Sequence, residues 1–298
     1  MKIKKITDDL HEGYKLTNQE MNDLNLKGKV AVITGGAGII CSEMAKSLSQ
    51  QGVKTAILDL NRDAAVRVAK TIEKEIKSQC IGLVANVLDK KSLEDAKDEI
   101  NRIFGPVDIL VNGAGGNSPA ATTKVEKIEG SEDPADTFFG LQIEGFDKVF
   151  DLNVKGTIIP TMVFAVDMVK KRSGVIINIS SMNSYRPLTK IAAYSAAKAS
   201  VNNLTQWLAV HFSKTGIGVN AIAPGFLLTN QNRFLLVDEK TGESTPRGRK
   251  IINNTPMERY GTAEELTGTL LYLASDLSRF VTGVVIPVDG GFSAYSGV

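Results

Sequence analysis

The amino-acid sequence predicts an α/β protein in which one mostly parallel, seven-stranded sheet is covered by helices on both faces. Short apolar runs alternate with longer amphipathic stretches from Lys29 almost to the C-terminus, as in repeated strand–helix–strand units. All of the apolar runs fit one open sheet, so the 298 residues need no second domain.

The expected elements follow from this alternation. The predicted strands are Val30–Thr34, Thr55–Leu58, Cys80–Val84, Ile109–Val111, Val175–Ser180, Gly218–Ala223 and Val284–Val288. The predicted helices have apolar residues at helical spacing, and they are Ser42–Gln51, Asp63–Lys77, Lys91–Phe104, Phe146–Lys171, Ala192–Lys214 and Ala263–Ser275.

Three polar stretches interrupt the pattern. Residues 1–26 form an N-terminal extension, and the domain comprises residues 27–298. Residues 116–145 and 226–256 are too polar for core elements and too long for ordinary connections. Both begin after strands, at the edge where open α/β sheets bind ligands, so we expect them to be substrate-binding lids. The alternative is that they are mobile surface insertions.

Composition excludes several classes of function. Lys and Arg number 35 against 33 Asp and Glu, and this balance gives no electrostatic footprint for nucleic acid or an anionic membrane. A small anionic substrate remains compatible with it. No signal peptide and no run of roughly 20 apolar residues is evident, so we expect a cytoplasmic protein. Cys41 and Cys80 have neither metal-site spacing nor a disulfide pattern, so we predict two buried thiols and no metal.

A glycine-rich turn follows the first predicted strand, with Gly35, Gly36 and Gly38 between Thr34 and the next helix. Glycines there let the backbone approach a pyrophosphate and aim helix N–H groups at it. The second strand leads into Asp59, whose carboxylate can accept both hydroxyls of an adenosine ribose and would repel a 2′-phosphate. The pattern predicts a doubly wound, Rossmann-type site that binds NAD (as NADH in reduction) in preference to NADP. The alternative is that Asp59 caps the following helix.

A second constellation predicts the chemistry. Ser181 ends the fifth strand, and Tyr194 and Lys198 leave one face of the next helix, one turn apart. An ammonium close to a phenol lowers its pKa from about 10, which makes the phenol a usable acid or base. Ser181 can hold a substrate oxygen as charge develops on it. We therefore expect a hydride-transferring oxidoreductase that acts on a carbonyl or alcohol carbon.

With these residues in place, the chain from about Leu26 onward resembles the short-chain dehydrogenase/reductase family. The matching segments are Thr34-Gly35, Leu110-Val111-Asn112-Gly113-Ala114-Gly115, Asn153-Val154-Lys155-Gly156, Ser181 with Tyr194 and Lys198, Pro224-Gly225 with Thr229, and Val288-Asp289-Gly290-Gly291. The resemblance implies that Asn153 completes a catalytic tetrad, through a water that links Lys198 to solvent. It also implies a homotetramer, with the Phe146–Lys171 and Ala192–Lys214 helices at one interface.

The resemblance implies a cofactor site as well. Its residues are Gly35, Gly36, Gly38, Ile40, Asp59, Asn86, Val87, Asn112, Ala114, Tyr194, Lys198, Pro224, Gly225 and Thr229. Four positions depart from the usual pattern. Ile39 and Cys41 stand where the second and third glycines are usual, Asn86 replaces an aspartate, and Gly113 replaces an asparagine, which we expect to remove only a sheet-stabilising side chain.

Four segments, residues 112–117, 181–190, 206–211 and 292–297, are similar to those of the D-mannonate oxidoreductases, also called fructuronate reductases, of this family. This implies a sugar-acid substrate, with Arg186 and Arg233 as candidates for its carboxylate, because an arginine fork matches a carboxylate. Beside Ser181, the residues Asn117, Asn183 and Gln231 are candidates for sugar hydroxyls. Three alternatives stay open: a gluconate or polyol dehydrogenase, a 3-ketoacyl thioester reductase, and an NAD-sensing regulatory protein without turnover.

Overall fold

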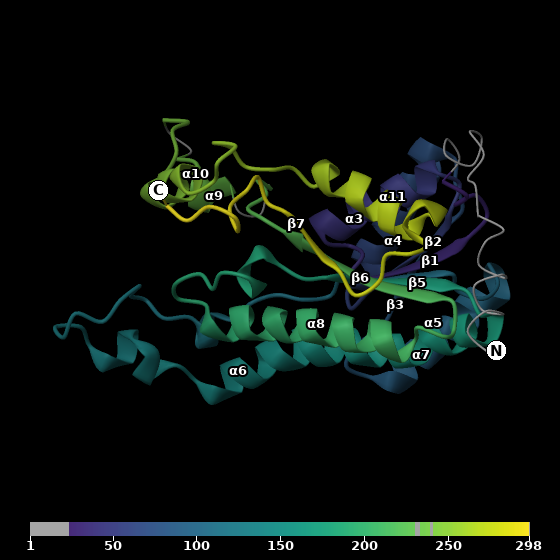
Figure 1. The fold of residues 1–298 in the computed structure, drawn as a ribbon, viewed down its shortest axis with the longest axis horizontal. Helices are drawn as coiled ribbons and strands as arrows, with labels where there is room; N and C mark the ends of the chain where they lie inside the picture. Colours follow the sequence, from purple (N-terminus) through teal and green to yellow (C-terminus); the bar gives the residue numbers. More distant parts are fainter. Residues whose placement is uncertain (1–23, 230–232, 239–240, 298) are drawn as a thin grey trace, which may run out of the picture.

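The computed structural model describes residues 24–229, 233–238 and 241–297 and contains one parallel sheet (Figure 1). Its strand order is β3-β2-β1-β4-β5-β6-β7. The strands are β1 (Val30–Thr34), β2 (Lys54–Asp59), β3 (Cys80–Val84), β4 (Ile109–Asn112), β5 (Gly174–Ile179), β6 (Ile217–Pro224) and β7 (Val285–Val288). The predicted fold class is confirmed, and each predicted strand is present with bounds that differ by at most one residue at either end.

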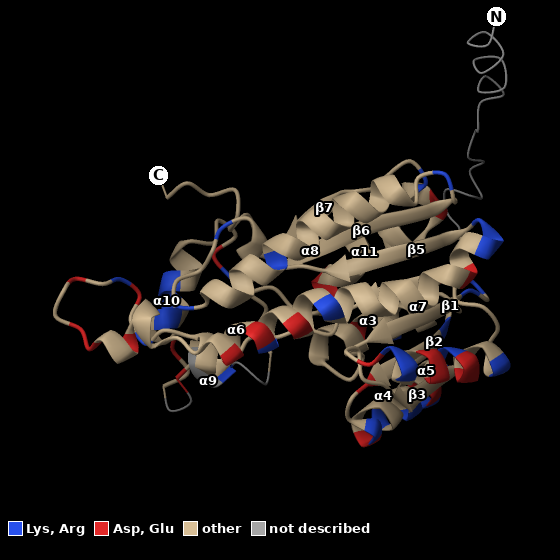
Figure 2. Ribbon diagram, turned by 90° about the horizontal axis from the view of Figure 1, so that it is seen from below, with Lys and Arg blue, Asp and Glu red and all other residues tan. Residues whose placement is uncertain are grey.

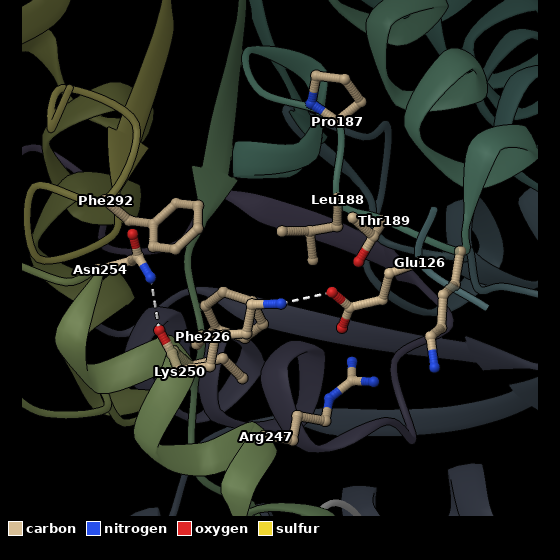
Figure 3. Close-up of a pocket in the computed structure, with 11 residues that line it drawn as sticks. Glu126, Pro187, Leu188, Thr189, Phe226, Arg247, Lys250, Asn254 and Phe292 are labelled. Atoms are coloured by element: carbon tan, nitrogen blue, oxygen red, sulfur yellow. Dashed lines mark hydrogen bonds and ion pairs between the residues drawn. The ribbon is translucent and has the colours of Figure 1, made fainter. Parts of the chain in front are cut away.

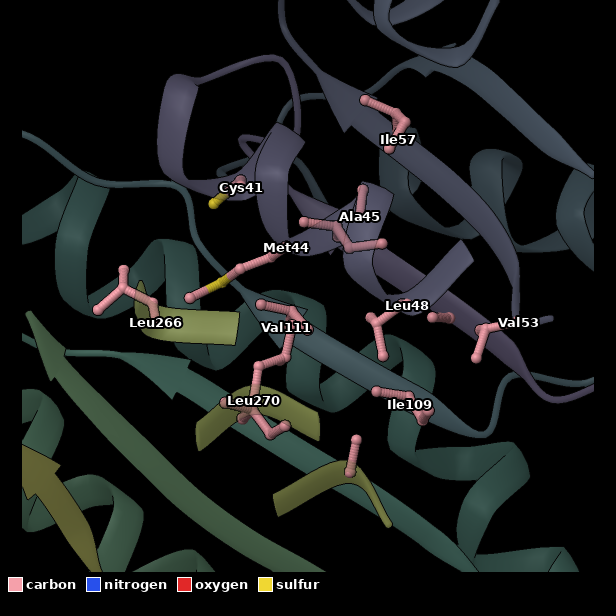
Figure 4. Packing of buried hydrophobic residues seen from close by; sticks show 14 of the residues in the cluster. Cys41, Met44, Ala45, Leu48, Val53, Ile57, Ile109, Val111, Leu266 and Leu270 are labelled. Carbon is pink, nitrogen blue, oxygen red and sulfur yellow. The ribbon is translucent and has the colours of Figure 1, made fainter. Parts of the chain in front are cut away.

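Two apolar layers hold the sheet because successive strand residues point to opposite faces. Ile33, Val111 and Ile177 pack with Met44 and Leu270 on one face. Figure 4 shows part of this layer, in which Met44 and Leu48 of helix α3 (Ile39–Gln50) meet Val111 and Ile109. The other face carries Val32, Leu110 and Ile176, which pack with helical residues such as Phe164.

Helices cover both faces, and Figure 1 shows α3, α4 and α11 on one side with α5, α7 and α8 on the other. Their bounds are α3 (Ile39–Gln50), α4 (Arg62–Ile76), α5 (Lys90–Ile103), α6 (Ile143–Phe150), α7 (Gly156–Lys171), α8 (Ala192–His211), α9 (Arg233–Leu236), α10 (Pro246–Asn253) and α11 (Thr267–Ala274). The last of these follows a short 3₁₀ helix, η6 (Glu264–Leu266).

The shift in bounds that matters for the site is at α3, which begins at Ile39 rather than at Ser42. Gly38 is its N-cap and has no side chain to cap the helix. The helix N-terminus therefore lies inside the glycine-rich turn, directly beside the carboxyl ends of the strands.

The predicted helix Phe146–Lys171 is longer and less regular than expected. It runs through α6, a π-helical turn, η4 (Asp151–Lys155), and α7. By length and composition this segment could cross a membrane, but half of its most apolar window is buried inside the domain, as in the core helix of a globular protein. A π-helical turn widens the backbone spiral and is frequent at functional sites.

Both long polar stretches contain short helices and extend beyond the carboxyl edge of the sheet (Figure 1). Residues 116–145 hold three 3₁₀ turns, η1 (Pro119–Ala121), η2 (Pro134–Asp136) and η3 (Phe138–Gly140), and end at the start of α6. Residues 226–256 hold α9 and α10, where the Thr245 hydroxyl accepts a hydrogen bond from Gly248 N at the start of α10. Figure 2 shows acidic and basic residues interspersed along α5, whereas α10 carries basic residues alone.

Candidate active site

The strand order reverses between β1 and β4, which opens a cleft at their carboxyl ends. This cleft has a volume of about 540 Å³. Its lining comes from the glycine-rich turn, the ends of β2 and β4, and the segment after β6, and consists of Gly35, Gly38, Ile39, Ile40, Cys41, Asp59, Gly113, Ala114, Gly115, Gly225, Phe226, Leu227 and Thr229. Many predicted cofactor positions therefore converge on one cavity.

The glycine-rich turn leaves room for a ligand. Gly35 has a φ of 61°, a left-handed conformation that favours glycine, and a Cβ there would come within 2.8 Å of Ala114 Cα. Gly36 does not line the cleft, but a Cβ there would fall 2.8 Å from the carbonyl oxygen of Ile33. The first N–H groups of α3 have no partner within the helix, and Gly38, Ile39 and Ile40 at its start line the cleft. This arrangement fits a pyrophosphate.

Cys41 and Gly113, two of the residues that depart from the usual family pattern, fit together sterically. A Cβ at Gly113 would collide with the sulfur of Cys41, which is buried in the first turn of α3. Gly113 therefore does more than remove a sheet-stabilising side chain, because its missing Cβ makes room for the thiol. Burial raises the pKa of Cys41 to about 12 and that of Cys80 to about 11, so both thiols stay protonated at neutral pH.

Asp59 is fixed at the edge of the cleft by backbone groups. One carboxylate oxygen accepts a hydrogen bond from Ala37 N at 3.2 Å, and the other accepts one from Asn61 N at 2.9 Å. The alternative that Asp59 caps the next helix is wrong, because Asn61 is the N-cap of α4 and accepts from Ala64 N. Asp59 is thus available at the rim, in the position expected for contact with a ribose.

The remaining cofactor candidates differ in what their side chains do. Asn86 is exposed and accepts a hydrogen bond from Leu88 N, while Val87 is buried near Gly156 of α7. The Asn112 side chain points into the interior, where Nδ2 donates to Asn178 Oδ1 and Thr161 Oγ1. Asn112 therefore connects β4 to β5 and α7 and does not line the cleft.

The segment after β6 closes the other end of the cleft. Pro224 ends β6 and is buried, while Gly225 and Thr229 line the cleft. A Cβ at Gly225 would come 2.5 Å from Asp289 Cα, so this turn lies tightly against the segment after β7.

Ser181, Tyr194 and Lys198 converge at the edge of the cleft: none of the three lines it, but Lys198 Nζ lies beside Gly115, which does. The Ser181 hydroxyl hydrogen-bonds the Tyr194 phenol, and Lys198 Nζ lies 5.7 Å from the centroid of the Tyr194 ring. Ser181 follows β5, and the other two residues lie on α8, as the sequence predicted.

Burial dominates the titration of Tyr194 and Lys198. It raises the pKa of Tyr194, with the Ser181 hydrogen bond acting in the opposite direction. The prediction that Lys198 lowers this pKa below its ordinary value is therefore not met in this structure. Burial also lowers the pKa of Lys198 to about 8, and its ammonium donates to the carbonyl oxygen of Ile179 at 2.7 Å.

Asn153 lies behind this group, in the π-helical turn. Its Nδ2 donates to the carbonyl oxygens of Gly116 and Val149, and its Oδ1 accepts from Gly116 N. A Cβ at Gly115 would fall 2.6 Å from Asn153 Oδ1 and 3.2 Å from Lys198 Nζ. Asn153 and Lys198 thus flank the same glycine, a neighbour that sequence reasoning did not single out.

Comparison with known proteins agrees with this geometry. Residues 36–293 match the family described as enoyl-(acyl carrier protein) reductase. The chain is 51% identical to UxuB of Bacillus subtilis (strain 168), described as an uncharacterized oxidoreductase, over 92% of this chain and 98% of that protein. The chain belongs to the short-chain dehydrogenase/reductase family.

Solved structures of this family extend the comparison. One, with bound NAD and provisionally described as a D-mannonate oxidoreductase of Haemophilus influenzae, is 51% identical, with a TM-score of 0.88 over 94% of this chain and all of that one. A gluconate 5-dehydrogenase of Burkholderia cenocepacia J2315, in complex with NADP and tartrate, is 29% identical, with a TM-score of 0.76 over 92% and 98% of the two chains. The predicted class is confirmed: this short-chain dehydrogenase/reductase is an NAD-dependent oxidoreductase.

A smaller pocket of about 210 Å³ adjoins the cleft, and Phe226 lines both. Its lining is Glu126, Pro187, Leu188, Thr189, Lys190, Phe226, Arg247, Lys250, Ile251, Asn254 and Phe292, and we call it the side pocket. Figure 3 shows the Lys250 ammonium directed at the Glu126 carboxylate, with Arg247 on the same side of the pocket. Both long polar stretches contribute to it, as expected of substrate lids.

The predicted substrate residues are only partly near this pocket. Arg186 Nε donates to the carbonyl oxygen of Ser293, and Arg233 is exposed at the start of α9; neither lines the side pocket. Asn117 is exposed and donates to Thr122 Oγ1, whereas Asn183 is buried with Oδ1 unpaired among the described residues. Gln231 lies outside the described residues.

The lysines and arginine of the side pocket were not predicted as ligands. Arg247 and Lys250 lie on the second long stretch, whose charges could have pointed to them, whereas no sequence signal marks Lys190, which lies just before α8. Among the described residues, no group of His, Cys, Asp or Glu side chains could hold a metal ion.

Proposed function

We propose that this enzyme reduces a keto sugar acid, D-fructuronate, to D-mannonate with NADH, and that it also catalyses the reverse oxidation. The observation that carries the chemistry is the convergence of Ser181, Tyr194 and Lys198 beside the cleft. The substrate is supported by the cationic side pocket and by the name given to the Haemophilus influenzae relative.

Tyr194 acts as the general acid. Its raised pKa keeps the phenol protonated at neutral pH, so it can donate a proton to the carbonyl oxygen of the substrate. The Ser181 hydroxyl holds that oxygen while negative charge develops on it. When bound, NADH supplies the hydride that reduces the carbonyl carbon.

Lys198 stabilises the tyrosinate that remains after the proton leaves. Its pKa of about 8 leaves it charged at neutral pH, and a cation near a phenolate favours the charged form. We assign to Asn153 the family's role of connecting Lys198 to solvent, which is supported by their shared contact with Gly115.

The cofactor would be held along the cleft. Gly35, Gly38 and Ile40 would bind the pyrophosphate, Asp59 the adenosine ribose, and Gly225 with Thr229 the nicotinamide end. Asn86 and Val87 would border the adenine, and Lys198 with Tyr194 the nicotinamide ribose. NADP is disfavoured because its 2′-phosphate would approach the Asp59 carboxylate.

Two other substrate classes are the alternatives to a keto sugar acid. The solved gluconate 5-dehydrogenase makes a gluconate or polyol dehydrogenase a reasonable second candidate. A 3-ketoacyl thioester reductase would need a long apolar channel, and the positive charges of the side pocket argue against one there. A regulatory NAD sensor without turnover disagrees with the oxidoreductase relatives.

Three further expectations are part of the proposal. Asn117, Asn183 and Gln231 would bond sugar hydroxyls, and the unpaired Oδ1 of Asn183 supports its inclusion. The protein would act in the cytoplasm, as a homotetramer. The division into an extension, residues 1–26, and a domain, residues 27–298, is also proposed, although the buried side chain of Leu26 belongs to the domain core.

The test is turnover of D-fructuronate with NADH and with NADPH, followed at the nicotinamide absorbance. We expect oxidation of NADH, with D-mannonate as product and a much lower kcat/KM with NADPH. Gluconate, polyols and a 3-ketoacyl thioester are assayed in parallel. A higher kcat/KM on any of them than on fructuronate or mannonate would replace the substrate assignment.

A further inference from the structure

The side pocket gathers three cations around one carboxylate. Glu126 pairs with Lys250, and the hydrogen bond from Lys250 lowers the pKa of Glu126, with Lys190 and Arg247 adding to the effect through their charges. Among the described residues, Lys190 and Arg247 have no carboxylate within ion-pair distance. The pocket thus contains two positive charges in excess.

Different segments bring these charges together. Glu126 belongs to the stretch 116–145, while Arg247 and Lys250 are three residues apart on α10 and so share one face of that helix. Arg249 lies between them on α10 and does not line the pocket; its guanidinium donates to the carbonyl oxygen of Ser244. The helix therefore directs two of its three cations into the pocket.

Lys190 is held in place by its backbone. Its φ of 73° is in the left-handed region, which residues with a side chain seldom adopt, and its carbonyl oxygen accepts a hydrogen bond from Thr123 N at 3.0 Å. Lys190 comes four residues before Tyr194, just ahead of α8. A group bound by Lys190 would therefore lie next to the start of α8, the helix that holds Tyr194.

We propose that Arg247 and Lys190 bind the carboxylate of the sugar-acid substrate, while Glu126 neutralises Lys250 and joins the two lid stretches across the pocket. The proposal rests on the proposed function for the identity of the anion. Apolar side chains complete the site: Phe226 and Phe292 meet edge to face at 5.3 Å between ring centroids, and Leu188 lies across from them (Figure 3).

This arrangement explains a preference for acids over neutral polyols. A substrate carboxylate would take up the uncompensated charge of Arg247 in paired hydrogen bonds, which a neutral group cannot do. A neutral polyol would leave Arg247 and Lys190 without an anionic partner in the side pocket. We therefore expect the enzyme to bind a polyol more weakly than an acid.

The experiment compares an acid with its neutral analogue. Arg247→Gln and Lys190→Gln are assayed with NADH on D-fructuronate and on its methyl ester, and Arg249→Gln is the matched control on the same helix. We expect kcat/KM on the acid to fall on the order of 10- to 100-fold in each pocket variant, and to change little on the ester. Arg247→Lys should recover part of the loss. Equal losses on acid and ester, or no loss on either, would overturn the proposal.

A binding measurement separates this proposal from the proposed function. If the wild-type enzyme turns over neither fructuronate nor mannonate, the proposed function fails, and calorimetric titration of D-mannonate into the NAD-saturated protein decides the carboxylate site. Binding that is lost in Arg247→Gln and kept in Arg249→Gln would support the site. No binding to the wild-type protein, or equal binding to both variants, would refute it.

Discussion

The sulfur of Cys41 occupies the space that a side chain at Gly113 would need. One residue lies in the first turn of α3 and the other directly after β4, where Gly113 N also donates to Thr34 Oγ1 at 3.1 Å. At both positions the chain departs from its family's usual residue. The two departures compensate each other sterically, and both residues line the cleft beside the glycine-rich turn.

This pairing predicts that Gly113→Asn alone is harmful. The larger side chain would overpack the junction against Cys41, at a cost of about 1–3 kcal/mol in the free energy of unfolding, and it would weaken NADH binding. Adding Cys41→Gly should recover a large part of both losses. Urea unfolding and fluorescence titration with NADH measure these effects, and strictly additive losses in the double variant would contradict the pairing.

Changing Tyr194 to Phe removes the phenolic proton while keeping the ring. We expect turnover to fall about 100-fold or more, because general acid catalysis is lost, with NADH affinity nearly unchanged. Tyr185→Phe is the control, since the Tyr185 hydroxyl donates to the carbonyl oxygen of Val285 and has no part in the chemistry. Near wild-type turnover by Tyr194→Phe would exclude the mechanism.

The pKa directions at Tyr194 and Lys198 predict opposite pH profiles for the two reactions. Reduction needs a protonated phenol and a charged Lys198, so its kcat should decline as the pH rises past about 8. Oxidation needs the tyrosinate, whose pKa is raised by burial, so its rate should increase with pH.

Lys198→Arg tests the contribution of the lysine to this profile. A guanidinium keeps its charge throughout the range, so any activity that the variant retains should lose the decline near pH 8. The measurement is steady-state kcat from pH 6 to about 10, for both reduction and oxidation. If the variant shows the same decline near pH 8, a group other than Lys198 causes it.

The sheet could be predicted closely because its signal is local. Residues 30–33 are apolar and, with Thr34, lie between Lys29 and a glycine-rich turn, so both ends of β1 are marked in the sequence. The start of α3 was missed because three glycines precede it and the helix begins immediately after the last one. The polar helix α10 was also missed, although Thr245-Pro246 is a recognisable start signal, with a capping hydroxyl followed by proline.

The candidate site likewise contains residues that the sequence could predict and residues that it could not. Ser181, Tyr194 and Lys198 could be named from spacing and resemblance, because they lie on neighbouring elements. The contact of Glu126 with Lys250 joins residues that are 124 positions apart on two polar stretches, and no local pattern encodes it. Arg186 was a reasonable candidate from sequence, but its side chain binds the C-terminal segment.

We expect Asp59 to set the preference for NADH over NADPH. Asp59→Asn removes the charge that would repel a 2′-phosphate, so the ratio of kcat/KM for NADPH to that for NADH should rise on the order of 10-fold or more. The control is Asn61→Ala, which removes the cap of α4 and should cost about 1 kcal/mol of stability without changing that ratio. An unchanged ratio in Asp59→Asn would show that another group selects the cofactor.

An exposed apolar groove between α7 and α8 is the surface where we expect two subunits to meet. Met162 and Val166 of α7 and Trp207 of α8 line an apolar groove, and Trp207 is 58% exposed while stacking on His211 at 4.7 Å between ring centroids. Exposed apolar patches of this kind are typical of interfaces. A charge at its centre, in Trp207→Lys, should convert the proposed tetramer into smaller species in sizing chromatography with light scattering. Phe280→Ser is the control, since Phe280 is a fully exposed aromatic residue that does not line this groove. A variant of Trp207 that keeps the wild-type mass would place the interface on another face.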